Sequence, residues 1–205
     1  MTKTIVLSYF NSDINWIKDI PQEYEIIIYN KGTTPLIIDR EIKEIKLENH
    51  GRESHSYIRY ISDNYEKLSD ITFFSQANPH EHISSFIDLL DITDSFWFSD
   101  LGYYYCYLDG TPTHPNLPIS NFCKKINLSP PEKIYFKPNG IFSVKKENIL
   151  NRPKFFYDNI LNIIEHTNKH NENLESIGDN SYPWILERLW DLIFDLKDEK
   201  LYEKI

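Results

Sequence analysis

Residues 49–82 constrain the fold of this chain more than any other segment. A polar loop, Asn49–Glu53, precedes a stretch in which four apolar residues recur at helical spacing, namely Tyr57, Ile58, Ile61 and Tyr65. The β-branched and aromatic run Ile71–Phe74 follows, and its composition predicts a short buried strand. A second polar segment, Gln76–His82, comes directly after it. Loops that follow the strands of an open α/β sheet meet at one rim where ligands bind, so both polar segments are expected to face one nucleotide-type site.

The first part of the chain alternates between strand and helix, which is the pattern of a parallel α/β sheet. Buried strands are predicted at Lys3–Tyr9 and Tyr24–Tyr29, and helices are predicted around Trp16–Ile17 and over Ile83–Leu90. The segment Pro35–Leu47 fits a loop with a short strand.

The second part of the chain has a weaker pattern. Asp94–Pro131 is rich in Tyr, Pro and Asp, and we expect irregular structure with short strands and helical pieces. Glu132–Lys145 returns to strand character, and Phe155–His166 and Trp184–Leu196 are the two clearest late helices. The Asn-rich segment Asn168–Asn180 between them is predicted to be a loop.

Composition excludes several classes of protein. The net charge is −9 and no basic block is present, so neither a nucleic-acid partner nor a polybasic membrane patch is expected. No apolar run approaches the ~20 residues of a transmembrane segment. Cys106 and Cys123 are the only cysteines, and their spacing fits neither a disulfide framework nor a zinc site. We therefore expect a soluble, reduced, cytoplasmic protein.

An ordered series of motifs resembles a widespread family catalogued as a domain of unknown function. The motifs are Ser8–Asp13 with Trp16, Tyr29–Gly32, Asn49–His55 with Tyr57, Phe73–Asn78 with His82, Gly140–Val144, Arg152–Pro153 with Phe156–Tyr157, and Glu187–Trp190. That family in turn resembles the GT-A class of nucleotide-sugar glycosyltransferases. The resemblance implies a single GT-A-like domain with a mostly parallel, Rossmann-related central sheet flanked by helices. Residues 1–93 would bind the nucleotide and residues 94–205 the acceptor.

The implied activity is glycosyl transfer from a nucleotide sugar to a glycan or another hydroxyl acceptor. In the GT-A class an Asn-x-Gly loop opens a helix, and the next strand ends in an Asp-x-Asp metal motif. This chain has Asn49 and Gly51 in the loop, but Gln76 and Asn78 stand where the two carboxylates are expected. Neutral amides are poorer ligands for a hard divalent cation such as Mn or Mg. We therefore expect weak or absent metal dependence and no certain cofactor.

The rim position and the resemblance together give the candidate substrate-binding residues, which are Tyr9, Asp13, Asn30, Lys31, Asn49, Gly51, Arg52, Glu53, His55, Gln76, Asn78 and Arg188. Gly51 and Arg52 at a helix start suit an anion, because the backbone N–H groups are free and arginine binds phosphate in a fork. The alternative is a plain helix start at which Arg52 pairs with Glu53 at the surface. Asp13 would accept a hydrogen bond from the base or ribose, or would cap the helix that carries Trp16.

Glu187 is the candidate catalytic base. GT-A enzymes often carry their catalytic carboxylate at the start of a late helix, and Glu187 lies on such a helix beside Arg188. The alternative is a structural ion pair between the two residues. Asp100, which follows the aromatic run Phe96–Phe98, is the reserve candidate.

Two further clusters admit more than one interpretation. His80-Glu81-His82 lacks the spacing that places two histidines on one helical face, and His82 is the more suitable of the two for a metal or hydrogen-bonding role. Tyr103–Tyr105 with Tyr107 would stack on sugar faces or pack in the interior, and packing is the commoner role.

Two other functions compete with glycosyl transfer. A non-catalytic nucleotide- or carbohydrate-binding module of the same fold would explain the missing carboxylates at Gln76 and Asn78. A metal-dependent hydrolase would use His55, His80 and His82.

Overall fold

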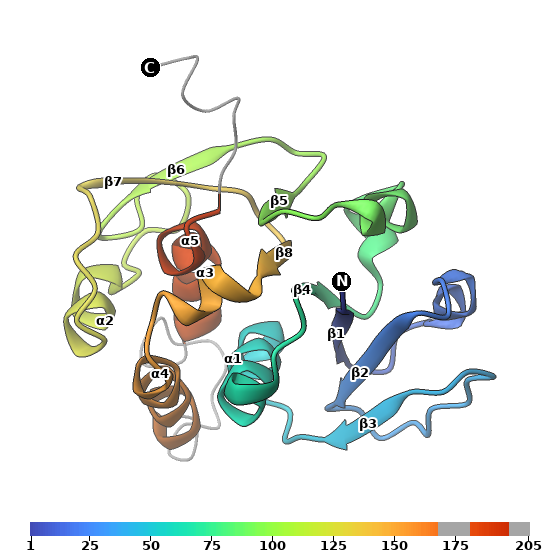
Figure 1. Ribbon diagram of the computed structural model, residues 1–205. Coiled ribbons are helices and arrows are strands. Elements are labelled where there is room, and N and C mark those ends of the chain that lie inside the picture. The colour runs from blue at the N-terminus through green and yellow to red at the C-terminus, as the bar shows by residue number, and fades with distance from the viewer. Residues whose placement is uncertain (168–180, 197–205) are drawn as a thin grey trace.

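The computed structural model describes residues 1–167 and 181–196. A six-stranded sheet runs through its centre in the order β3-β2-β1-β4-β8-β5 (Figure 1). These strands are Lys43–Lys46 (β3), Tyr24–Asn30 (β2), Lys3–Tyr9 (β1), Ile71–Gln76 (β4), Ile141–Lys145 (β8) and Phe96–Phe98 (β5). Strands β3, β2, β1 and β4 are parallel, and β8 is antiparallel to both β4 and β5. The expected mostly parallel α/β sheet is confirmed.

Strand β1 is the point at which the order of the sheet reverses. It pairs with β2 on one side and with β4 on the other, so that Ser8 lies opposite both Tyr29 and Gln76. Ligands of open α/β sheets bind beside such a switch point, outside the carboxyl ends of the strands. The topology therefore places the segments after β1, β2 and β4 next to one another.

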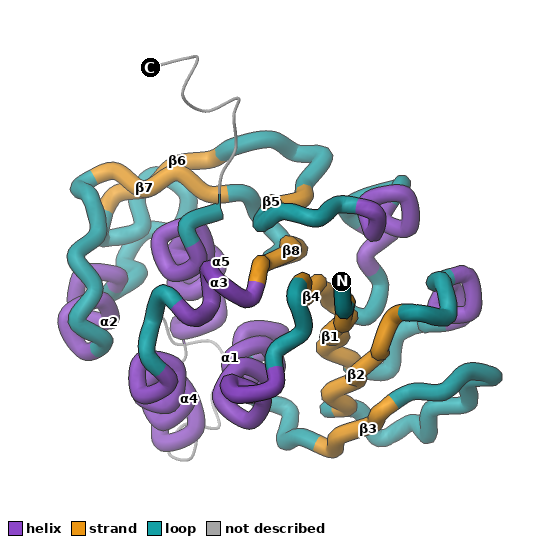
Figure 2. Tube along the Cα trace, in the orientation of Figure 1, coloured by secondary structure: helices purple, strands orange, loops and turns teal. Residues whose placement is uncertain are grey.

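Side-chain alternation along β1 divides the core into two layers. Val6 packs toward the helices α1 (Arg52–Asn64), α4 (Lys154–Thr167) and α5 (Tyr182–Phe194), whereas Ile5 and Leu7 pack against the other face. That face is covered by the 3₁₀ helices η1 (Asn15–Asp19) and η4 (Phe86–Asp91). Figure 2 shows α1, α4 and α5 gathered on one side of the sheet.

A small ribbon of two antiparallel strands, β6 (Tyr104–Tyr107) and β7 (Lys133–Phe136), lies beyond α5 in Figure 1. Its inner face carries Cys106 and Ile134, which pair across the strands and are buried. Both cysteines are free and buried. The remaining elements are α2 (Ile119–Lys125), α3 (Lys146–Leu150), η2 (Tyr65–Lys67) and η3 (Pro79–Glu81). None of the helices in residues 1–167 and 181–196 is long and apolar enough to cross a membrane.

The predicted elements differ from the structure in two places. Ile83–Leu90 was predicted as a helix, but only the 3₁₀ segment Phe86–Asp91 forms, with Phe86 and Leu90 turned into the core. The strand-like stretch Glu132–Lys145 is divided between two sheets, because Asn139 and Gly140 both take positive φ angles. The predicted loop Asn168–Asn180 lies outside the described residues.

Candidate functional site

The carboxyl ends of the four parallel strands surround a pocket of about 270 Å³, here called the carboxyl-end pocket. Its lining residues all lie at or after the end of a parallel strand: Ser8, Phe10, Ser12, Lys31, Asn49, Arg52, Glu53, Gln76, Ala77, Asn78 and Glu81. Six of the predicted substrate-binding residues are among them. The expected shared rim of the two polar segments is therefore a real cavity.

The loop before α1 takes an unusual backbone path. Gly51 and Arg52 have φ angles of +62° and +45°, in the left-handed region. A Cβ atom on Gly51 would lie 2.8 Å from both His55 Cβ and Ile164 Cγ2, so only glycine fits. The two consecutive left-handed residues lie where the loop enters α1, and Asn49 and Arg52 on either side of Gly51 line the pocket.

Lys31 is a buried cation at the pocket. Its ammonium donates hydrogen bonds to the backbone carbonyl of His50, at 2.7 Å, and to that of Arg52, so it holds the loop in place. Burial lowers the pKa of Lys31 to about 7, and the nearby Glu53 carboxylate acts in the opposite direction. Lys31 therefore changes its charge near neutral pH.

Arg52 lies beside Lys31 but is more accessible. Its guanidinium lies 4.5 Å from the centre of the Trp184 ring, and its Nε atom lies 3.8 Å from Glu53 Oε2. The stacked ring orients the cation, and slightly more than half of the Arg52 side chain, 56%, remains exposed. An anion in the pocket could reach it directly.

Glu53 has a carboxylate of raised basicity. Burial is the main cause of its raised pKa, and the negative charge of Glu187 adds to it. Its own backbone N–H, Arg52 and Lys31 act in the opposite direction. The side chain is 16% exposed and reaches the pocket, so it remains accessible to a ligand.

Glu187, the candidate base on α5, is held by two hydrogen bonds. Its Oε2 accepts from the backbone N–H of Asn139 at 3.0 Å, and its Oε1 accepts from Arg188 Nη1 at 3.0 Å. Arg188 also donates to the carbonyl of Trp184 at 2.6 Å and lies over the Phe136 ring. Arg188 is 4% exposed, so both residues join α5 to the β7–β8 connection rather than lining the carboxyl-end pocket.

Several predicted binding residues do not line this pocket. Tyr9 is buried in the sheet, and Asn30 is buried with its amide bonded to Glu44 and to the N–H of Gly32. Asp13 accepts the N–H of Asn15 at 2.9 Å in a local turn, but the residue at the N-cap of the 3₁₀ helix that carries Trp16 is Ile14, so the alternative capping role is not met either.

His55 faces a separate hollow between α1 and α4. Its Nε2 lies 3.1 Å from Glu165 Oε1, and its ring stacks on His50 with ring centres 4.3 Å apart. Burial is the main cause that lowers the pKa of His55 to about 4, and the charge of Lys31 lowers it further. His55 is therefore a neutral, buried residue at neutral pH that packs behind the Asn49–Arg52 loop.

Asp100 and the two histidines of the 80–82 run also lie off the pocket lining. Asp100 Oδ2 accepts the N–H of Ser84 at 3.4 Å in an exposed turn. His80 packs edge-on against Trp16, and His82 terminates η3. Within residues 1–167 and 181–196, no three His, Cys, Asp or Glu side chains gather as metal ligands would.

The pocket residues that replace the Asp-x-Asp pair do not fit a site for Mn²⁺ or Mg²⁺. Asn78 directs its amide nitrogen to Glu81 Oε1, at 2.8 Å, and Gln76 offers a second neutral amide. Hard divalent cations need several oxygen ligands, mainly carboxylates. The lining contains two carboxylates, Glu53 and Glu81, and Glu53 lies beside the cations Arg52 and Lys31.

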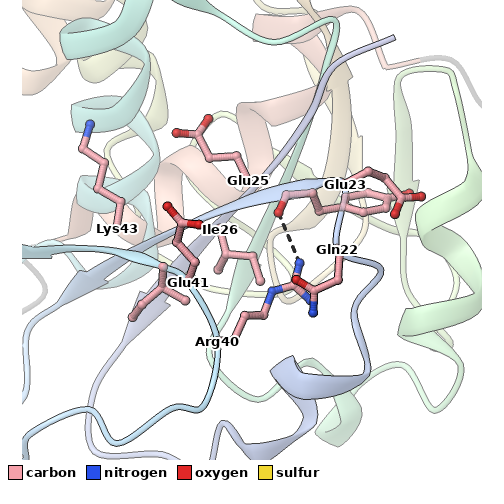
Figure 3. Close-up of a pocket in the computed structure, with 9 residues that line it drawn as sticks. Gln22, Glu23, Glu25, Ile26, Arg40, Glu41 and Lys43 are labelled. Atoms are coloured by element: carbon pink, nitrogen blue, oxygen red, sulfur yellow. Dashed lines mark hydrogen bonds between the residues drawn. The ribbon is translucent and has the colours of Figure 1, made fainter.

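A second and larger hollow, about 470 Å³, lies at the other end of β2 and is called the Arg40 hollow (Figure 3). It is lined by residues 22–26 and 40–43. The guanidinium of Arg40 donates hydrogen bonds to backbone carbonyls, among them those of Pro21 at 2.6 Å and Tyr24 at 3.2 Å. The dashed line in Figure 3 marks the latter bond. Arg40 therefore fastens the 31–42 segment to the start of β2.

Sequence reasoning missed part of the site. Glu81 was not a candidate residue, because only the histidines of the run His80–His82 were considered as ligands. Phe10 was part of the motif Ser8–Asp13 but had no predicted role of its own. Trp184, Gly140 and Trp190 reach the neighbourhood of Arg52 and Glu53 from distant parts of the chain. No local pattern in the sequence signals these contacts.

Residues 4–95 match a family described as a protein of unknown function (DUF3431). The matched segment contains the four parallel strands, except for the first residue of β1, and every residue that lines the carboxyl-end pocket. The expected domain-of-unknown-function family is thus confirmed over this part of the chain. No curated protein matches the sequence.

Proposed function

We propose that the protein binds a nucleoside diphosphate sugar in the carboxyl-end pocket and transfers the sugar to a hydroxyl acceptor. The observation that carries the proposal is that one pocket combines the ends of four parallel strands with two cations, Lys31 and Arg52. That edge of an α/β sheet is where nucleotides bind, and arginine beside a helix start is suited to phosphate. The resemblance to GT-A glycosyltransferases supports the same activity.

In this proposal the diphosphate lies between Lys31 and Arg52. The base lies against Phe10, which is 53% exposed at the rim and offers a ring for stacking, with Ser12 beside it. A volume of about 270 Å³ is just below the ~300–1,000 Å³ of typical ligand pockets. The pocket would enclose the diphosphate and the ribose, with the sugar extending toward Glu53.

The two cations would also serve the departure of the diphosphate. Negative charge grows on the leaving oxygen as the bond to the sugar breaks, and preorganised positive groups stabilise that charge. Lys31 is fixed by two backbone carbonyls and Arg52 by the Trp184 ring, so both are held in advance. Lys31 and Arg52 would balance the negative charge of the leaving diphosphate, which the neutral amides of Gln76 and Asn78 cannot do.

A thermal-shift screen tests the proposal. UDP-, GDP- and CDP-sugars are added with and without manganese, and one nucleotide class should raise the melting temperature in both conditions. Binding to the native state alone stabilises it by about 2.7 kcal/mol when the ligand is at 100 times its Kd. If no nucleotide sugar shifts the transition, the proposal fails.

The second candidate function is a non-catalytic nucleotide- or carbohydrate-binding module. The neutral Gln76 and Asn78 at the pocket favour it. The two functions differ in turnover, because only a transferase releases nucleoside diphosphate from the donor that stabilises it. Stabilisation without any release, in the presence of mixed glycan acceptors, would support the module.

A further inference from the structure

Two buried polar groups near Glu53 lack hydrogen-bond partners. Trp190 is fully buried against the rings of Tyr57 and Phe142, yet its Nε1–H has no acceptor among the described residues. The hydroxyl of Tyr57, which is also fully buried, has no partner in the same part of the chain. Buried donors are nearly always satisfied, so an unpaired one needs an explanation such as a ligand.

Gly140 lies between the Trp190 indole and Glu53, and its missing side chain leaves room for one carbon-sized atom beside both. A Cβ atom on Gly140 would lie 3.5 Å from Trp190 Nε1 and 4.0 Å from Glu53 Oε1. Gly140 has a φ angle of +57°, which favours glycine, and without a side chain its backbone can be approached closely. A small hydroxyl that entered this space would meet an indole N–H and a carboxylate. Glu53, Gly140 and Trp190 are here called the Gly140 notch.

The two carboxylates near the notch differ in their availability. Both oxygens of Glu187 accept hydrogen bonds, from Asn139 and Arg188. The contacts of Glu53 with described residues are weaker: Arg52 at 3.8 Å and its own backbone N–H. Glu53 thus keeps lone pairs free, and burial raises its pKa above the ordinary value of a carboxyl group. It also borders both the carboxyl-end pocket and the notch.

Resting on the proposed function, we propose that Glu53 is the proton acceptor of the transfer reaction and that the Gly140 notch seats the acceptor hydroxyl. Trp190 Nε1–H donates to the hydroxyl oxygen and orients it. The O–H proton moves to Glu53 while the oxygen forms a bond to the anomeric carbon of the donor. The bond from that carbon to the diphosphate breaks, and the diphosphate leaves with the electron pair. Glu187 is then a positioning residue that holds the turn at Asn139.

The test compares two isosteric variants, Glu53→Gln and Glu187→Gln. Turnover is measured as release of nucleoside diphosphate from the stabilising UDP-, GDP- or CDP-sugar, with water in the acceptor position. Glu53→Gln should lower turnover by the ~10²–10⁴-fold typical of lost general-base catalysis. Affinity for the free nucleoside diphosphate should stay within about 3-fold, since its main contacts are on Lys31 and Arg52. Glu187→Gln should lower the melting temperature and reduce turnover by less than about 10-fold.

Two further measurements keep the result specific. The acid limb of the kcat/KM profile, where the rate falls as Glu53 takes up a proton, should disappear in Glu53→Gln. The other charged or titratable groups that face Glu53 are unchanged in this variant; they are Lys31, Arg52, Tyr57 and Glu187. Gly140→Ala fills the notch and should lower turnover without changing nucleotide affinity. Glu41→Gln, an exposed residue of the Arg40 hollow, is the control that keeps wild-type turnover.

The outcomes separate the two proposals. Wild-type turnover in Glu53→Gln, or an unchanged acid limb, overturns the role of Glu53 and leaves the proposed function standing. A greater loss in Glu187→Gln than in Glu53→Gln assigns the base to Glu187 instead. If the wild-type protein binds none of UDP, GDP and CDP, the proposed function fails and this inference fails with it.

Discussion

The carboxyl-end pocket and the Arg40 hollow lie at opposite ends of β2, and each contains an arginine. The Arg40 hollow is the larger, at about 470 Å³ against about 270 Å³. Arg40 donates to four backbone carbonyls, those of Ile17, Ile20, Pro21 and Tyr24. Arg52 donates no hydrogen bond to the residues that the structure describes, and it rests on the Trp184 ring. Volume alone would therefore favour the Arg40 hollow, whereas the pairing of the two arginines favours the carboxyl-end pocket.

The difference lies in where each hollow places its donors. At the amino end of β2 the guanidinium donates to several backbone carbonyls of neighbouring segments, which is a structural role. At the carboxyl end the side chain of Arg52 is 56% exposed and lines the pocket, beside a lysine that is only 6% exposed. A pair of cations held without full pairing is suited to an incoming anion. The predictions below test this contrast.

The largest effect is expected for Lys31→Met. The change removes the ammonium from the pocket and should weaken binding of the nucleoside diphosphate by at least ~100-fold, or about 3 kcal/mol, as for a lost charged hydrogen bond. Because the pKa of Lys31 is about 7, most of this group is neutral at pH 8, and binding of an anion should draw a proton from the buffer. Calorimetry in two buffers of different ionisation enthalpy measures that uptake. Uptake that persists in Lys31→Met would contradict the assignment.

Acid should destabilise the protein through His55, which packs behind the Asn49–Arg52 loop. The pKa of His55 is about 4 in the folded state against 6.5 in the unfolded chain, so its contribution is complete above pH 6.5 and is lost as the pH falls to about 4. The loss amounts to about 3 kcal/mol. The pKa of Glu165 is lowered because hydrogen bonding from His55 and the charge of Arg59 outweigh burial, which gives a further loss below about pH 4.5.

Urea unfolding of wild type and His55→Gln between pH 7 and 4 measures this effect. The difference between the two proteins is the useful quantity, because the raised pKa of Glu53 acts in the opposite direction over part of the range. Parallel stability curves for the two proteins would show that His55 does not carry the acid sensitivity. Neither hollow at the ends of β2 is lined by a histidine. The loss of stability in acid therefore reports on the surroundings of His55 and not on either hollow.

Arg40→Ala should affect stability and leave nucleotide binding unchanged. Several carbonyls near the start of β2 lose their donor, and we expect a cost of about 2 kcal/mol, or roughly 4–8 °C in Tm for a chain of this length. Calorimetry with the nucleoside diphosphate provides the second readout. Weaker binding in a variant that stays folded would mean that the Arg40 hollow contributes to the site.

The smallest effect is expected from removal of metal. Since Gln76 and Asn78 are neutral amides, excess EDTA should leave donor turnover within about 2-fold of its original value. Complete loss on chelation, followed by rescue with manganese, would show that the pocket binds a metal that its side chains do not indicate.

The sequence predicted the first part of the fold well because its signals are local. Strands β1, β2 and β4 are nearly continuous apolar runs, and α1 has a clear helical period, so all four lie within a few residues of the predicted bounds. The carboxyl-end pocket follows from the parallel topology alone. In contrast, the segment Ile83–Leu90 has apolar residues at helical spacing but forms only a 3₁₀ turn, because its packing against the sheet overrides its periodicity.

The parts of the site that could not be predicted depend on contacts across the chain. His55 and Lys31 were both predicted to bind the substrate. Tertiary packing places His55 in a separate hollow and Lys31 in the carboxyl-end pocket. Gly140, in the turn between β7 and β8, lies beside both Glu53 and Trp190 of α5, and the two lie about 90 and 140 residues beyond Glu53 in the chain. The spacing of residues in the sequence does not predict such long-range contacts. Glu187 was chosen from the resemblance to GT-A enzymes and Asp100 from its place after the aromatic run Phe96–Phe98, and their catalytic roles stay predictions.

The most direct test of the account is calorimetry of nucleoside diphosphate binding to wild type, Arg52→Ala and Arg40→Ala under identical conditions. The account predicts that Arg52→Ala binds about 10-fold more weakly, as expected for one lost charge-assisted contact of about 1.5 kcal/mol, with an unchanged melting temperature. Arg40→Ala should bind with wild-type affinity at a lower melting temperature. Equal affinities for wild type and Arg52→Ala would contradict the placement of the diphosphate and, with it, the central claim.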